Sequence, residues 1–309
     1  MSDNYDAQAL WLKAKLFLNH AMDDGDERSF DERALWAALA LELLAKSALS
    51  RHSPLLIASP TEDGGNLLAA SGLTPPQPKF TSVPAKTLMS RCAKAFVPFS
   101  EAEAGKITIA RNAYLHGGAA QFAPLPPEAW WPKFWAQALI LIQAQDKTLE
   151  DMVGESRVDE VESHLAQNKK NVESRTQALI ERAKQRLAQF RSGNLPARLA
   201  DEFAKDRDLS SGFWGKYGTA TCPACGDSDA AVEGDNIVAS KVEGAWGGSD
   251  LDDYVTWVEL TVSSSHFSCS TCRLVLPDYE FIEAAGVDTE FTTTDDDVAE
   301  YYGPEYGND

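Results

Sequence analysis

The sequence predicts a mainly α chain in which a helical bundle and charged helices precede a small β-rich domain. Three observations support this fold class. Apolar residues recur at helical spacing through about the first 150 residues, and charged helical sequence without repeats follows. After about residue 210, glycine and aromatic residues become frequent. In the segment that separates two pairs of cysteines, β-branched residues alternate with other residues, as in a strand. We therefore expect a helical bundle over residues 1–153 and a charged helical connector over 154–210. A small β-rich domain over 211–283 and an acidic tail over 284–309 should follow.

Two helices are expected to open the bundle. The apolar spacing over residues 11–22 predicts an amphipathic helix. Ser29 is followed three residues later by Glu32, which is the signature of a capping box and predicts a second helix over residues 33–50. Residues 53–84 are rich in Pro, Gly and Ser, and this composition predicts a long loop with room for one short helix.

Three further helices complete the expected bundle. Residues 84–96 have helical spacing. Ser100 can cap the next helix with Glu103 as its partner, and Gly117 ends that helix. Two consecutive prolines then open a long helix that extends to about residue 152. Three tryptophans of this helix are expected in the core or in a dimer interface: Trp130, Trp131 and Trp135.

The charged segment that follows contains a strongly basic stretch. Between Lys169 and Arg191 there are seven basic residues and two acidic ones. One interpretation is a solvated helix face, which is the ordinary place for charged residues. The other is a stripe that follows the phosphates of a nucleic acid. The end of the chain contrasts with it, because residues 280–309 contain ten acidic residues and no Lys or Arg. We expect the acidic tail, residues 284–309, to be loosely ordered.

The composition excludes several classes of protein. The chain has 47 acidic and 28 basic residues and a formal net charge of −19, so it is no general polycation for nucleic acid. Contact with RNA or DNA would have to come from a local basic patch. No stretch reaches the ~18 apolar residues that span a bilayer, and the first residues lack the basic and apolar regions of a secretory signal. We expect a cytoplasmic protein without membrane contact.

Four of the five cysteines form two CxxC pairs, Cys222 with Cys225 and Cys269 with Cys272. In a reducing compartment such pairs are metal ligands rather than disulfides. A spacer of two residues lets both sulfurs of a pair reach one ion, and Zn²⁺ prefers four tetrahedral thiolate or imidazole ligands. Four cysteines fill that shell, so we expect a structural Zn²⁺. The fifth, Cys92, fits a small buried hydrophobe.

The residues beside the cysteines favour tight turns. Gly226 follows the first pair and allows the unusual backbone angles of a metal-binding knuckle, whereas Arg273 takes the same place after the second pair. Residues 222–226 and 269–273 resemble the two knuckles of a zinc ribbon. Because 43 residues separate the two pairs, we place a β-hairpin insertion between them. His266 lies near the second pair and is expected to be a strand residue.

A second motif lies at the end of the helix that Gly117 terminates. It consists of Arg111, Asn112 and, four residues after the asparagine, His116. An ordinary structural explanation exists, because a histidine in the last turn of a helix is favoured by the helix dipole. Arg111 can likewise be a surface cation, or pair with Glu103 or Glu42. The catalytic interpretation needs further support from the surrounding sequence.

That support is a resemblance to a known family. Residues 5–150 resemble the HEPN domain, whose motif is Arg, four to six residues, and His, often with Asn after the Arg. An earlier helix of that family commonly resembles Ala-Leu-Glu-Leu-Leu-Ala-Lys-Ser-Ala-Leu, which is residues 40–49 here. The resemblance implies a helical bundle, a homodimer and a metal-independent endoribonuclease. It also implies a role in phage defence or toxin-like growth arrest.

The implied chemistry suits the residue types. RNA is cleaved when its 2′-OH attacks the adjacent phosphate, which needs a proton acceptor, a proton donor and stabilisation of added negative charge. The resemblance implies that His116 transfers the proton, Arg111 stabilises the phosphate and Asn112 orients one of them, with two copies meeting across a two-fold interface. Histidine titrates near neutral pH, and arginine is a permanently charged phosphate ligand. The products would carry 2′,3′-cyclic phosphate and 5′-OH ends.

Two other functions remain open at this point. The helical domain could dimerise and the ribbon could bind a protein or nucleic acid while no bond is broken. Alternatively, the chain could be a sensor subunit whose nuclease waits for a trigger or a protein regulator. Fold alone does not decide between these functions, because one fold serves many of them.

Overall fold

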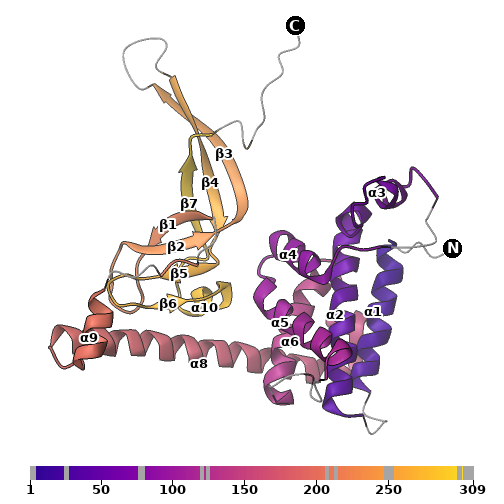
Figure 1. Cartoon of the computed structure of the whole chain (residues 1–309), viewed down its shortest axis with the longest axis horizontal. Helices are drawn as coiled ribbons and strands as arrows, with labels where there is room; N and C mark the ends of the chain where they lie inside the picture. Colours follow the sequence, from indigo (N-terminus) through magenta and orange to yellow (C-terminus); the bar gives the residue numbers. More distant parts are fainter. Residues whose placement is uncertain are drawn as a thin grey trace. The chain divides into compact units, whose positions relative to one another are not determined.

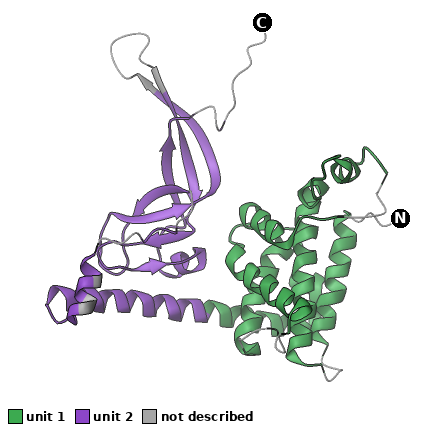
Figure 2. Ribbon diagram, viewed as in Figure 1, with its two compact units in different colours: residues 1–169 green, residues 170–309 purple. Residues whose placement is uncertain are grey.

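The computed structural model describes residues 5–23, 28–75, 81–118, 122, 126–205, 209–211, 215–246, 254–297 and 301. The chain forms two compact units, residues 1–169 and residues 170–309 (Figure 2). The boundary between them falls inside helix α8 (Val158–Arg191), so the expected connector, residues 154–210, is shared by the two units. The predicted class, a helical first part and a smaller β-containing part with four clustered cysteines, is confirmed.

Unit 1 is helical (Figure 1). Two of the predicted caps are present: Ser29 accepts a hydrogen bond from the Glu32 backbone N–H, and Ser100 accepts one from the Glu103 N–H. Its described helices are α1 (Ala7–Met22), α2 (Phe30–His52), η1 (Pro54–Leu56), α3 (Gly65–Ala70), α4 (Ala85–Ala95), α5 (Glu101–His116), α6 (Pro127–Gln143), α7 (Leu149–Val153) and η2 (Glu155–Arg157).

The expected long helix to residue 152 is wrong, because the structure has two helices there. Helix α6 ends at Gln143, and Asp146 adopts a positive φ of 53°, a conformation that continues no helix. Thr148 and Asp151 then form a capping box that starts α7: the Thr148 side chain accepts from the Asp151 N–H, and the Asp151 carboxylate accepts from the Thr148 N–H.

The core of unit 1 is built around α2. This helix buries a face rich in alanine and leucine, and small alanine side chains let neighbouring helices approach closely. All three tryptophans of α6 are buried, so they belong to the core and offer no exposed surface for base stacking. Cys92 is fully buried as expected, and burial raises the pKa of its thiol to about 12.

The described part of unit 2 contains the second half of α8, two short helices and two antiparallel sheets. The sheet order is β1-β2-β5-β6 in one sheet and β3-β4-β7 in the other. Hairpin β3–β4 lies between the two cysteine pairs, as predicted from their spacing. The elements are α9 (Ala197–Ala204), β1 (Lys216–Ala220), β2 (Ala230–Gly234), β3 (Asn236–Trp246), β4 (Tyr254–Ser263), β5 (His266–Ser268), β6 (Val275–Leu276), α10 (Tyr279–Ala284) and β7 (Glu290–Asp295).

The expectation of a loosely ordered tail from residue 284 is wrong for residues 290–295, because these form strand β7. The strand pairs with β4 and places Phe291 opposite Val262. Phe291 is buried and packs so closely on β1 that a Cβ at Gly218 would lie 2.5 Å from its ring. An ion pair between Lys216 and Asp295 joins the same two strands. One buried aromatic therefore anchors a segment whose composition is acidic.

Candidate functional site

The four paired cysteines converge in unit 2. Their sulfur atoms all lie within 4.8 Å of one another, with 3.5 Å between Cys222 and Cys272 and 3.6 Å between Cys225 and Cys269. Four thiolates placed tetrahedrally about 2.3 Å from a zinc ion would be about 3.8 Å apart. The observed spacing fits that arrangement, so these four residues could bind a metal ion such as zinc.

The sheet topology explains why the two pairs meet. Cys222 and Cys225 lie in the turn between β1 and β2, and Cys269 and Cys272 lie in the turn between β5 and β6. Strand β2 is paired with β5 in an antiparallel register that brings the start of β2 next to the end of β5. Both turns consequently leave the sheet at the same end, although they are far apart in the sequence.

Both knuckles have the same backbone turn. Gly226 follows the first pair with a φ of +76°, and Arg273 follows the second pair with a φ of +62°. The backbone N–H of Gly226 donates to the carbonyl of Cys222, and that of Arg273 donates to the carbonyl of Cys269 (2.9 Å each). A left-handed backbone costs about 1 kcal/mol or more for a residue other than glycine. The Arg273 guanidinium is bonded to the carbonyls of Phe203 and Lys205, and these bonds hold the strained turn in place.

Electrostatics favours a cation at this cluster. Burial raises the pKa of the Cys269 thiol to about 12 and also raises the pKa of Cys272. At the less buried Cys225, burial is outweighed by hydrogen bonds from the Asp227 backbone and the other three thiols, which lower the pKa. Thiolates at such a site need a positive charge beside them, which a divalent ion would supply.

His266 lies in β5 as expected, and its Nε2 is 2.9 Å from the carbonyl oxygen of Leu209.

Arg111 belongs to a buried charge cluster between α5 and α2. Its Nη1 atom is 2.6 Å from Oε2 of Glu42, and Nζ of Lys46 is 2.7 Å from the other oxygen of the same carboxylate. The three side chains are only 12–18% exposed. Burial by itself raises the pKa of Glu42, but Lys46 and Arg111 together outweigh it and hold this pKa below its ordinary value. Two cations share one carboxylate, so the cluster keeps one net positive charge.

The structure decides between the two predicted partners of Arg111. Glu103 is engaged by Lys106 and Lys133, with nitrogen–oxygen distances of 2.5 and 3.3 Å. Glu42 lies 69 residues before Arg111 in the chain and is the carboxylate that binds it. Glu42 also forms an i,i+4 ion pair with Lys46, so this carboxylate binds two cations at once.

His116 and Asn112 lie on the exposed face of α5. They are one helical turn apart, and both are exposed. Two apolar side chains share this part of the helix surface, Ile109 at 69% and Leu115 at 46% exposure. Among the described residues, no hydrogen bond or ion pair joins Arg111 to Asn112 or His116. The chain thus brings the histidine and asparagine together and directs the arginine towards α2.

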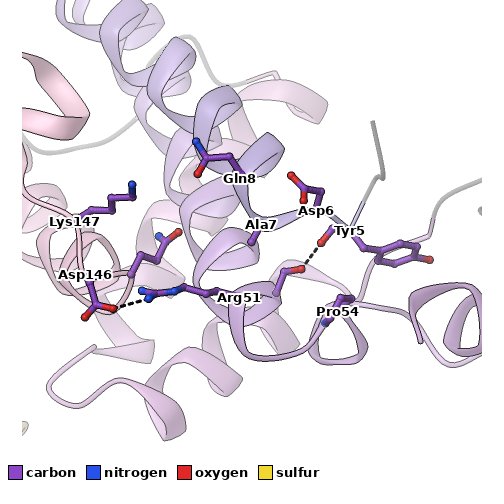
Figure 3. A pocket seen from close by; sticks show the side chains of 10 residues that line it. Tyr5, Asp6, Ala7, Gln8, Arg51, Pro54, Asp146 and Lys147 are labelled. Atoms are coloured by element: carbon purple, nitrogen blue, oxygen red, sulfur yellow. Dashed lines mark hydrogen bonds and ion pairs between the residues drawn. The ribbon is translucent and has the colours of Figure 1, made fainter. Parts of the chain in front are cut away.

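A pocket also lies in unit 1, where the start of α1, the end of α2 and the α6–α7 loop meet (Figure 3). Arg51 forms an ion pair with Asp146 there, and the Ser50 hydroxyl donates to the carbonyl of Tyr5. None of the predicted site residues lines this pocket. The sequence contained no signal for it, because its walls come from three distant segments.

Comparison with known proteins adds no assignment, because no family model, curated protein or solved structure matches this chain. In the described part of the chain, no helix has both the length and the apolar character needed to cross a membrane.

Replacing Glu42 should destabilise unit 1. In Glu42→Gln, two largely buried cations lose their shared carboxylate, and we expect the free energy of unfolding to fall by about 3 kcal/mol. Because the folded pKa of Glu42 is below its ordinary value of 4.5, its contribution is present above that pH and is lost as pH falls below it. The difference between wild type and Glu42→Gln should therefore shrink in acid. Urea denaturation at pH 7 and at low pH measures both effects.

The matched control is Lys106→Gln, which removes an ion pair whose lysine side chain is 66% exposed. Exposed pairs contribute about 0–1 kcal/mol, so this variant should unfold almost like wild type. Equal losses in Glu42→Gln and Lys106→Gln would contradict the assignment of a structural charge cluster.

Proposed function

We propose that unit 1 is a metal-independent endoribonuclease of HEPN type that acts as a dimer. The observation that supports this best is the exposed pair of Asn112 and His116 near the end of α5, the helix that also carries Arg111 of the cationic cluster on its other side. A proton-transfer group, an amide and a phosphate-binding charge are the parts that RNA cleavage through its own 2′-OH requires. RNA cleavage by the full chain in the presence of EDTA tests the proposal.

The proposed reaction uses two copies of His116. Neutral His116 of one copy accepts the proton of the 2′-OH as the 2′ oxygen forms a bond to the adjacent phosphorus. The bond between phosphorus and the 5′ oxygen breaks, and the leaving oxygen takes a proton from protonated His116 of the other copy. Histidine suits both tasks because its ordinary pKa lies near neutral pH. The products are a 2′,3′-cyclic phosphate and a 5′-OH.

Arg111 would stabilise the added negative charge on the phosphate. A single bond to Glu42 leaves other guanidinium N–H donors for a phosphate, and the cluster with Lys46 has a net positive charge. In this proposal Glu42 is a positioning residue that holds the arginine, and Asn112 orients the phosphate or His116. Because Arg111 and His116 are on different sides of one helix, the arginine of one copy would serve the histidine of the other.

The dimer interface would include the apolar part of the α5 surface. In Ile109→Glu, an exposed apolar residue becomes a carboxylate, and the two copies would place these like charges beside each other at the two-fold axis. We expect the dimer to dissociate and the rate of RNA cleavage to fall at least tenfold. Sedimentation velocity and a cleavage assay measure the two effects. Leu73 is 76% exposed outside α5, so Leu73→Glu is the control and should change neither. A monomeric wild type that cleaves RNA would rule out the dimer mechanism.

For unit 2 we propose a structural Zn²⁺ held by the four clustered cysteines. The knuckle turns and the sulfur spacing support this assignment. All four positions of a tetrahedral ion would be filled by thiolates, so the ion would stabilise the fold and would leave no position for substrate. The ribbon would then hold RNA or a protein partner.

One observation favours the alternative of a dimeric binding module that breaks no bond. The Arg111 guanidinium is bound to Glu42 and largely buried, as a structural arginine would be. A folded, metal-loaded dimer that binds RNA without cutting it would support this alternative. Phage defence and toxin-like growth arrest, which the family resemblance implies, belong to the ribonuclease proposal only.

A further inference from the structure

The second half of α8 packs against the rest of unit 2 along a single narrow stripe. Its buried residues occur at helical spacing and belong to the core of that unit or lie beside it: Val172, Thr176, Ile180, Ala183 and Leu187. The remaining faces of this half of the helix are mostly exposed. Basic side chains on those faces are therefore available to a ligand.

Three arginines line one flank of this helix. Arg175, Arg182 and Arg186 are seven and four residues apart, which puts them within about 40° of one another around the helix axis. At 1.5 Å per residue they extend over about 16 Å. All three are exposed. The Cζ atom of Arg175 is 5.1 Å from the centre of the Phe281 ring on α10, a contact that orients this guanidinium.

Among the described residues, none of these three arginines forms an ion pair with a carboxylate. Four arginines of unit 1 form ion pairs: Arg28 with Glu32, Arg51 with Asp146, Arg111 with Glu42, and Arg157 with Asp23. The chain has 47 acidic residues to 28 basic ones, yet no described carboxylate is ion-paired with an arginine of this flank. The two acidic residues of this half of α8, Glu173 and Glu181, are on the other flank, where Glu181 pairs with Lys184 (2.9 Å).

We propose that Arg175, Arg182 and Arg186 bind the phosphate backbone of a single RNA strand, and this inference takes RNA as the ligand from the proposed function. Guanidinium groups form forked, charge-assisted bonds to phosphate oxygens, and a row of them along a rigid helix follows a strand without recognising its sequence. The net charge of −19 repels RNA from most of the surface, so this flank determines where the strand binds.

The test measures RNA binding separately from cleavage. All proteins carry His116→Ala in the full chain, and anisotropy of a labelled single-stranded RNA gives Kd from 50 to 200 mM salt. One variant combines Arg175→Gln, Arg182→Gln and Arg186→Gln. The control combines Lys169→Gln, Lys170→Gln and Lys184→Gln, which removes the same charge from the same helix. Glutamine is a good helix former and these side chains are exposed, so both variants should fold.

We expect the arginine variant to lose at least tenfold in affinity at 50 mM salt. Its slope of log K against log salt should be smaller than that of the parent by about 2, because each lost contact to a single strand removes about 0.7. The lysine control should keep the slope of the parent protein.

Equal losses in both variants, or unchanged binding in the arginine variant, would overturn the proposal. So would binding of an acidic peptide to this flank with no binding of RNA. Because cleavage plays no part in the measurement, a chain that binds RNA through these arginines but never cuts it would disprove only the ribonuclease proposal.

Discussion

His116→Ala should lower the rate of RNA cleavage by about 10²- to 10⁴-fold, which is the usual contribution of a proton-transfer group. His116 is exposed, so its removal should change the free energy of unfolding by no more than about 0.5 kcal/mol. The loss of activity would then come from chemistry and not from unfolding. Single-turnover cleavage of a labelled RNA and urea denaturation give the two values.

Two variants control this result. His52 occupies the last turn of α2 as His116 occupies the last turn of α5, so His52→Ala should cleave RNA at the wild-type rate. Arg111→Lys retains the charge and loses the forked donors, and we expect it to cleave at least tenfold more slowly. If His116→Ala cuts RNA as fast as wild type, His116 has no role in cleavage.

Cys272→Ser should abolish metal binding and unfold unit 2. Cys272 is fully buried in the cysteine cluster, and structural zinc contributes about 10–16 kcal/mol in small zinc-dependent domains. Unit 2 should become sensitive to proteases while the helical unit 1 stays resistant. Elemental analysis should find one zinc ion in each wild-type chain and none in the variant, and limited proteolysis followed by mass spectrometry should locate the cuts.

The matched control is Cys92→Ala, which removes a buried thiol of unit 1. That chain should keep its zinc and a protease-resistant unit 2. Zinc retained at one equivalent by Cys272→Ser, or a wild-type chain purified without any metal, would contradict the proposed metal centre.

Local patterns explain most of what could be predicted from the sequence. The CxxC pairs and the residues after them determine a turn within five residues, so the two knuckles were predictable, and the long spacing indicated the hairpin β3–β4. The caps at Ser29 and Ser100 are equally local. Strand β7 was not predictable in the same way, because its position depends on Phe291 packing against a strand more than 70 residues earlier.

In the candidate site, too, the local features were predictable and the contacts between distant segments were not. The helix that ends at Gly117 fixes the one-turn spacing of Asn112 and His116, and this was predictable. The partner of Arg111 was not, because two carboxylates were available and only the packing of α5 on α2 selects Glu42. The second copy that the ribonuclease mechanism needs involves contacts outside one chain, and no local pattern determines these.

The central claim, that this chain cleaves RNA through the 2′-OH, can be tested on the substrate. The wild-type chain is incubated briefly with RNA in EDTA, with its zinc content measured before and after, and the product ends are identified by mass spectrometry. We predict 2′,3′-cyclic phosphate and 5′-OH ends, and no cut where a single 2′-deoxy nucleotide replaces the nucleotide before the cleaved bond. Cleavage that persists at the 2′-deoxy position, or products with 5′-phosphate ends, would contradict the mechanism.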